Sequence, residues 1–97
     1  MDKDLIRKIE RREKILGDFK NLLIENLGIN RTPEQIDPDT PLFGSGLGLD
    51  SVDAVELMVC VQVKFGAQVP SDSSGRLAMR TVNSMVDFVI SYMDEKK

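Results

Sequence analysis

The chain has 97 residues, a formal net charge of −3, one cysteine, and neither histidine nor tryptophan. This length predicts a single domain with one small core and leaves little room for a deep catalytic cleft. Because histidine is absent and Cys60 stands alone, the sequence predicts no metal site and no disulfide, which favours a reducing compartment such as the cytoplasm.

The charge is unevenly distributed. Residues 1–14 hold six basic and four acidic residues, which leaves a net charge of −5 on the remainder. An acidic body repels phosphate backbones, so nucleic acid is not an expected partner. The N-terminus mixes charges with isolated aliphatic residues, and we therefore expect neither a signal peptide nor insertion into a membrane. A cytoplasmic monomer is the expectation.

The first predicted element is a long amphipathic helix that ends at Gly28. Its apolar residues recur every three or four positions, at Leu5, Ile6, Ile9, Ile15, Leu16, Phe19, Leu22, Leu23 and Leu27. Gly17 lies inside this helix and costs about 1 kcal/mol relative to alanine, so residues 1–13 are a candidate separate or frayed extension.

A long connection follows at residues 28–49, where three prolines and four glycines exclude one regular element. Thr32 and Gln35 are expected to cap a short helical turn between them. Connections of this length usually have a function beyond joining two helices. Five apolar residues are expected to hold this one against the core: Ile36, Leu42, Phe43, Leu47 and Leu49.

A second helix is predicted to begin at an Asp50 cap, with Asp53 in its first turn, and to end at Gly66. One apolar stripe suits a core: Leu57, Met58, Val61 and Phe65. A second apolar line lies beside Asp53 and Glu56, and consists of Val52, Val55 and Val59. A helix that is apolar on two sides is either wholly buried or offers one face to a partner, and the neighbouring acids favour the partner.

After Pro70 the sequence allows a short helix over residues 73–79, with Leu77 and Met79 directed inward. Thr81 then caps a final helix, whose apolar residues are Val82, Met85, Val86, Phe88, Val89, Tyr92 and Met93. The predicted fold is an all-α four-helix bundle with three principal helices, one short helix and a long loop between helices one and two.

The run GSGLGLDSVDAVEL at residues 44–57 carries the strongest functional signal. A dinucleotide site would need a strand before its glycines, and a serine nucleophile elbow would need a different spacing and a histidine. Both are excluded, and we expect no catalytic residue. A plain alternative is that the glycines make a turn and that Ser51 only helps to cap the helix.

The stretch from Leu49 to Leu57, after a glycine-rich loop and before Phe65-Gly66, resembles the modification site of acyl carrier proteins. The likeness includes Leu27-Gly28-Ile29, the run Ile36-Asp37-Pro38-Asp39-Thr40-Pro41-Leu42, Val69-Pro70 and Thr81-Val82, and covers about residues 14–93. We therefore expect one domain over residues 1–97, with residues 14–93 as the carrier core and residues 1–13 as a charged N-terminal extension.

The resemblance implies that the chain is not an enzyme. It implies a 4′-phosphopantetheine arm on Ser51, attached from coenzyme A by a phosphopantetheinyl transferase, with an acyl group held on the arm as a thioester. A phosphodiester there would also meet free N–H groups at the positive end of the helix dipole. Asp50 would cap the helix and help the transferase to position its metal ion.

Further partners implied are acyl-transferring and condensing enzymes of fatty acid, polyketide or related lipid synthesis. The predicted docking face joins Val52, Val55 and Val59 with Asp53 and Glu56. In this chain Val52 replaces the family's usual leucine, and Arg76 and Arg80 lie in a region that is usually acidic. These departures favour a specialised carrier with dedicated partners.

Two other functions stay open on the sequence alone. A carrier of amino acids or peptides, including D-alanine, would share the serine and the fold. An unmodified helical interaction module would use the apolar line of the second helix for dimerisation. If that module were a DNA-binding regulator, a basic recognition helix would be expected, but residues 50–65 hold three acids and one base.

Overall fold

The computed structural model describes residues 2–95, and within them the chain forms four α-helices, one 3₁₀ helix and no strand. In chain order the elements are α1 (Lys3–Asn26), η1 (Pro33–Gln35), α2 (Ser51–Phe65), α3 (Ser73–Ala78) and α4 (Val82–Glu95). The predicted all-α fold is confirmed, including the short third helix and the long loop between α1 and α2.

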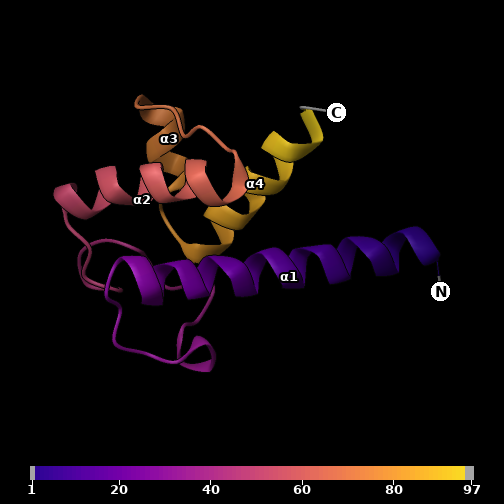
Figure 1. The fold of residues 1–97 in the computed structure, drawn as a ribbon, viewed down its shortest axis with the longest axis horizontal. Helices are drawn as coiled ribbons and strands as arrows, with labels where there is room; N and C mark the ends of the chain where they lie inside the picture. The colour runs from indigo at the N-terminus through magenta and orange to yellow at the C-terminus, as the bar shows by residue number, and fades with distance from the viewer. Residues whose placement is uncertain (1, 96–97) are drawn as a thin grey trace.

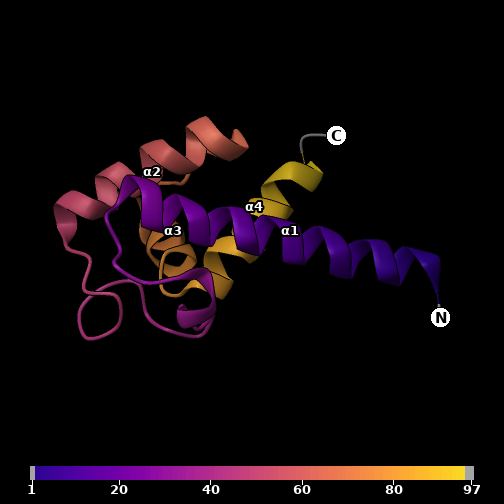
Figure 2. The same ribbon diagram turned by 60° about the horizontal axis from the view of Figure 1, so that its bottom comes forward.

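Helix α1 runs along the molecule, and α2 returns above it in the opposite direction, while α4 begins just above the middle of α1 and slants away from it toward the C-terminus (Figure 1). Helix α1 packs against α2, α4 and η1, and α3 packs against α4. The long loop folds back beneath the C-terminal end of α1, next to the point where α2 begins, as Figure 2 shows. No helix within residues 2–95 has the length and apolar content needed to span a membrane.

The core contains residues from α1, α2 and α4, from the long loop, and from the segments just before and after α3. Its buried apolar residues are Ile15, Phe19, Leu22, Leu23, Ile36, Leu42, Leu49, Leu57, Val61, Ala67, Val69, Met79, Val82, Met85, Val86 and Val89. Phe43 and Leu47 pack against this cluster from partly buried positions. The five predicted loop anchors are therefore confirmed, and the loop is held at both ends.

Three predicted caps are confirmed. Asp50 caps α2, and Gly66 ends it in the left-handed conformation at φ 71°. Thr81 caps α4, because its hydroxyl accepts from the Ser84 N–H at 3.0 Å. These local signals explain why three helix ends lie where the sequence predicts them.

Helix α1 differs from its prediction at both ends. It ends at Asn26 rather than Gly28, and Gly28 adopts φ 70° in the turn that follows. The helix also continues without a break through Gly17, so residues 3–13 form its first half rather than a separate or frayed segment. A β-carbon at Gly17 would meet no atom within 4 Å, so this glycine has no close packing role.

The inward orientation predicted for Leu77 is wrong, although Met79 is buried as expected. Leu77 is 61% exposed. The buried residue of α3 is Gly75, whose backbone lies so close to Pro70 that an added β-carbon would be 1.7 Å from the Pro70 carbonyl oxygen. Leu77 is two residues further along the helix and therefore lies on its opposite side.

Candidate functional site

Ser51 is the first residue of α2, and its side chain is exposed. Two residues earlier, Leu49 is buried in the core with 6% exposure, while Asp50 between them is exposed. The chain therefore leaves the core at Leu49 and presents the next two side chains to solvent. A separate enzyme could reach the Ser51 hydroxyl in this position.

The glycines before the serine have identifiable backbone roles. Gly44 and Gly48 adopt positive φ values of 67° and 78°, which other residues rarely accept. Gly46 lies against Pro41, where a β-carbon would come within 1.9 Å of the carbonyl oxygen. The loop closes through a 2.9 Å hydrogen bond from the Leu47 N–H to the same oxygen. The glycines thus fold the loop tightly and fix where α2 starts.

The first turn of α2 is closed by a reciprocal pair of carboxylates. Oδ1 of Asp50 accepts from the N–H groups of Val52 and Asp53 at 3.0 Å each. Oδ2 of Asp53 accepts from the Asp50 N–H at 3.0 Å. This is a capping box with aspartate in both positions.

The capping box corrects one expectation about the helix terminus. The N–H groups of Val52 and Asp53 already donate to Asp50, so they are not free for an anion on Ser51. The helix dipole still favours negative charge at this end, but the two nearby carboxylates oppose it. Asp50 is exposed, and its Oδ2 accepts no hydrogen bond from another described residue.

Helix α2 presents a wide apolar face to solvent, which we call the valine face. Its members are Val52, Val55, Val59 and Val63, exposed by 73%, 63%, 55% and 82%. Leu57 and Val61 are fully buried on the other side of the helix. Glu56 is exposed and Asp53 half-buried. Four of the five predicted docking residues, namely Val52, Val55, Val59 and Glu56, are thus brought together on the surface.

Sequence reasoning missed Val63 as a member of this face. It lies four residues after Val59, so the repeat that grouped the other three valines already contained the signal. Cys60 is half-buried, and burial, together with the nearby Glu56 carboxylate, raises the pKa of its thiol. This cysteine is therefore a poor nucleophile at neutral pH.

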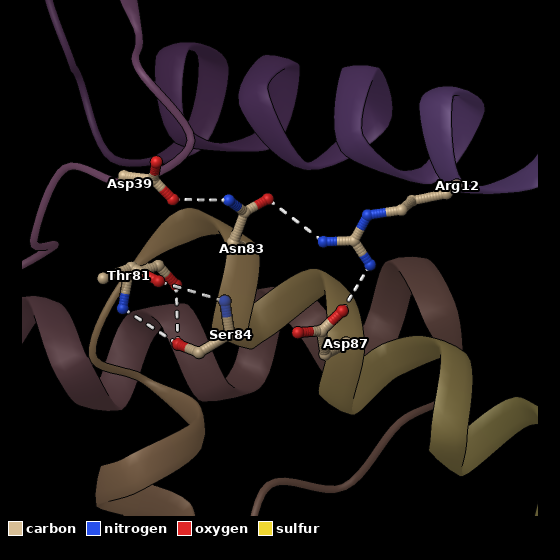
Figure 3. A network of polar contacts seen from close by, with 6 residues as sticks. All are labelled: Arg12, Asp39, Thr81, Asn83, Ser84 and Asp87. Atoms are coloured by element: carbon tan, nitrogen blue, oxygen red, sulfur yellow. Dashed lines mark hydrogen bonds and ion pairs between the residues drawn. The ribbon is translucent and has the colours of Figure 1, made fainter. Parts of the chain in front are cut away.

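A polar network joins α1, the long loop and α4 (Figure 3). The Arg12 guanidinium forms an ion pair with Asp87 and donates to Oδ1 of Asn83 at 3.0 Å. The Asn83 amide in turn donates to Asp39 in the loop at 2.7 Å. The preceding residue of α1, Arg11, pairs with Asp94 near the end of α4 at 2.7 Å. These contacts attach the N-terminal half of α1 to α4.

The composition of the charged N-terminal segment does not predict this network. Arg12 lies three residues before Ile15 and seven before Phe19, both of which are buried. That spacing places it on the core-facing side of α1 and could have identified it.

A family model and several known proteins are similar to this chain, and they agree with one another. Residues 18–89 match the family model described as a phosphopantetheine attachment site. An acyl carrier protein of Wolinella succinogenes is 32% identical over 75 residues, which cover 77% of this chain and 92% of the relative. One from Chloroherpeton thalassium is 32% identical over 85 residues, covering 88% and 95%. A third, from Thermosynechococcus vestitus, is 30% identical over 76 residues, covering 78% and 88%.

Proposed function

The chain belongs to the acyl carrier protein family, and we propose that it holds acyl groups on a 4′-phosphopantetheine arm attached to Ser51. Members of this family are carriers rather than enzymes, and the arm is their cofactor. When bound, the arm supplies a thiol on which an acyl group is held as a thioester. A transferase modifies the carrier, and other enzymes act on its cargo.

The observation that carries the proposal is the exposed hydroxyl of Ser51 at the first position of α2, directly after the buried Leu49. In the modification, the Ser51 oxygen forms a bond to phosphorus while the pyrophosphate bond of coenzyme A breaks. The hydroxyl proton passes to the transferase, and the nucleotide half of coenzyme A leaves. The exposed position supports this reaction because no side chain of the chain itself has to move.

Asp50 is proposed to have two roles that use different oxygens. Oδ1 caps α2, and Oδ2 is available to a metal ion held by the transferase. Carboxylate oxygens are ligands that divalent cations such as Mg²⁺ prefer. Asp50 thus helps to recruit the modifying enzyme without weakening the helix that presents Ser51.

The valine face, together with Asp53 and Glu56, is proposed to dock partner enzymes. Among these partners are the transferase and the acyl-transferring and condensing enzymes of fatty acid, polyketide or related lipid synthesis. An apolar centre with charges at its edge is the usual anatomy of such interfaces. Acidic residues beside it favour partners with basic patches. Residues 14–93 are proposed as the carrier core, with residues 1–13 as its N-terminal extension, and the cytoplasm is the proposed compartment.

The direct test is the intact mass after incubation with coenzyme A and a broad-specificity phosphopantetheinyl transferase. We expect a gain of one phosphopantetheine unit that is lost in Ser51→Ala. Ser45→Ala is the matched control, since Ser45 is also exposed and lies in the glycine-rich loop. A gain that persists in Ser51→Ala would refute the attachment site, and no gain in the unmutated chain would favour an unmodified interaction module.

The same assay separates acyl from aminoacyl cargo. The relatives named above are acyl carrier proteins, which supports the acyl alternative. The modified chain should accept fatty acyl groups from an acyl-transferring enzyme and refuse amino acids, including D-alanine, from an aminoacyl-activating enzyme. The reverse pattern would assign it to the aminoacyl carriers.

A further inference from the structure

A hollow of about 300 Å³ lies where the end of α3 meets the returning loop, and its two arginines have no role in the function proposed above. We call it the arginine hollow, and it is lined by Pro41, Phe43, Arg76, Met79, Arg80 and Thr81. Met79 is buried and Phe43 half-buried, whereas both arginines are exposed. The hollow therefore combines an apolar interior with two cationic groups at its edge.

The two guanidinium groups are not neutralised by the chain itself. Neither Arg76 nor Arg80 forms an ion pair with any residue in the described range 2–95. Guanidinium groups match carboxylates well, because they donate two parallel hydrogen bonds to the two oxygens. An apolar group that ends in a carboxylate is thus the ligand that fits both parts of the hollow.

Two backbone hydrogen bonds connect the hollow to the segment just before Ser51. The Leu42 N–H donates to the Arg80 carbonyl at 2.9 Å, and the Leu49 N–H donates to the Leu42 carbonyl at 3.1 Å. Leu49 is two residues before Ser51. These links place the Arg80 backbone within about 18 Å of the Ser51 backbone, a separation of the order that an extended phosphopantetheine chain covers.

We propose that the arginine hollow receives the free carboxylate of an acyl group held on the Ser51 arm, so that the preferred cargo is the half-thioester of a dicarboxylic acid. This inference rests on the proposed function and names the class of substrate for the same site. The positive charges also disfavour an aminoacyl cargo, whose ammonium group they repel.

The test compares two cargoes of equal chain length that differ in one carboxylate. A broad-specificity transferase loads Ser51 from glutaryl coenzyme A or from valeryl coenzyme A, and intact mass confirms the loading. Backbone amide chemical shifts are then recorded by NMR and compared with those of the unmodified chain. The amides of residues 42–43 and 76–81 should shift more with glutaryl than with valeryl cargo, because only the glutaryl group brings a carboxylate to the two guanidinium groups.

The double variant Arg76→Gln/Arg80→Gln should lose this difference. The matched control Arg7→Gln/Arg31→Gln should keep it, because it removes two exposed arginines that do not line the hollow. Equal shifts for the two cargoes would overturn the inference, as would a difference that survives in Arg76→Gln/Arg80→Gln. Equal loading with equal shifts would leave the carrier function intact, so the two failures are distinguishable.

If the transferase does not load the chain, the proposed function fails, and the hollow is tested on the unmodified chain. Soluble glutaryl-pantetheine and valeryl-pantetheine are titrated under the same NMR conditions. The glutaryl compound should bind with a dissociation constant at least about threefold lower, and only while Arg76 and Arg80 are present. Equal dissociation constants would overturn the inference.

Discussion

The carboxylates of Asp50 and Asp53 each accept the backbone N–H of the other residue across the first turn of α2, at 3.0 Å in both directions. Ser51 lies between them, so the turn that presents the hydroxyl is fixed on both sides. This arrangement makes Asp50 a structural residue as well as a candidate recognition residue, and the two roles can be separated by mutation.

Asp50→Ala should lower the free energy of unfolding by about 1 kcal/mol, because the N–H groups of Val52 and Asp53 lose their acceptor. Asp50→Asn keeps an acceptor oxygen and should stay within a few tenths of a kcal/mol of the parent. If the charge recruits the transferase, both variants should lower kcat/KM of modification at least about tenfold, a change of about 1.4 kcal/mol. Urea unfolding and mass-based loading rates check the two effects. Full loading of Asp50→Asn would show that capping is the only role of Asp50.

The valine face can be tested without disturbing the core. Val55→Ser/Val59→Ser changes two exposed side chains and should alter the free energy of unfolding by less than about 0.5 kcal/mol per site. Loading by the transferase should nevertheless slow at least about fivefold, since central apolar contacts dominate interfaces. Ile9→Ser is the control, because Ile9 is 47% exposed on α1 and lies outside the face. Loading slowed equally in the control would argue against docking through α2.

Replacing glycine by alanine should change the free energy of unfolding in opposite directions at two positions with different surroundings. Gly75→Ala places a methyl group against the Pro70 carbonyl and should destabilise the chain by about 1–3 kcal/mol. Gly17→Ala meets no atom within 4 Å inside α1 and should stabilise it by about 0.5–1 kcal/mol. Urea unfolding of both variants gives the comparison. A neutral Gly75→Ala would mean that α3 can move away from Pro70 at little cost.

The contact between Arg12 and α4 predicts that the first half of α1 contributes to stability. Arg12→Met removes the ion pair with Asp87 and the hydrogen bond to Asn83, and should cost about 0.5–1 kcal/mol, since the pair is partly exposed. High salt should reduce this cost, because screening weakens exposed pairs. Arg7→Met is the control, with an exposed arginine outside the network. Hydrogen exchange should quicken in residues 3–12 of Arg12→Met only.

How much of this structure follows from the sequence depends on the range of the interactions involved. Helix ends were predictable at Asp50, Gly66 and Thr81 because a cap is set by residues within one turn. The exposure of Ser51 followed from the same local logic together with the burial of Leu49. The all-α class followed from apolar periodicity, which depends only on spacing.

Two of the features that sequence reasoning missed, the exposure of Leu77 and the pairing of Arg12, depend on contacts between different elements of the fold. Leu77 points outward because Gly75, rather than a larger side chain, meets the preceding segment at Pro70. Arg12 finds its partners on α4, more than 70 residues away. The spacing of residues within one helix indicates which side faces the core. It does not indicate which polar side chains of another helix lie opposite that side.

The last prediction concerns the reactivity of the Cys60 thiol. Burial, and to a smaller extent the Glu56 carboxylate, raise the pKa of Cys60, so at any pH below that pKa its thiolate fraction is smaller than that of an ordinary cysteine. Iodoacetamide at neutral pH should therefore alkylate Cys60 more slowly than free cysteine. In the unmodified chain, the alkylation rate of Cys60 should rise with pH and reach half its maximum above the midpoint of a free cysteine. Glu56→Gln should lower this midpoint without bringing it fully to that of free cysteine, because burial remains, whereas the distant exposed Glu25→Gln should leave it unchanged. Mass spectrometry of timed reactions measures each rate, and a Cys60 midpoint at or below that of free cysteine would show that its burial does not protect it.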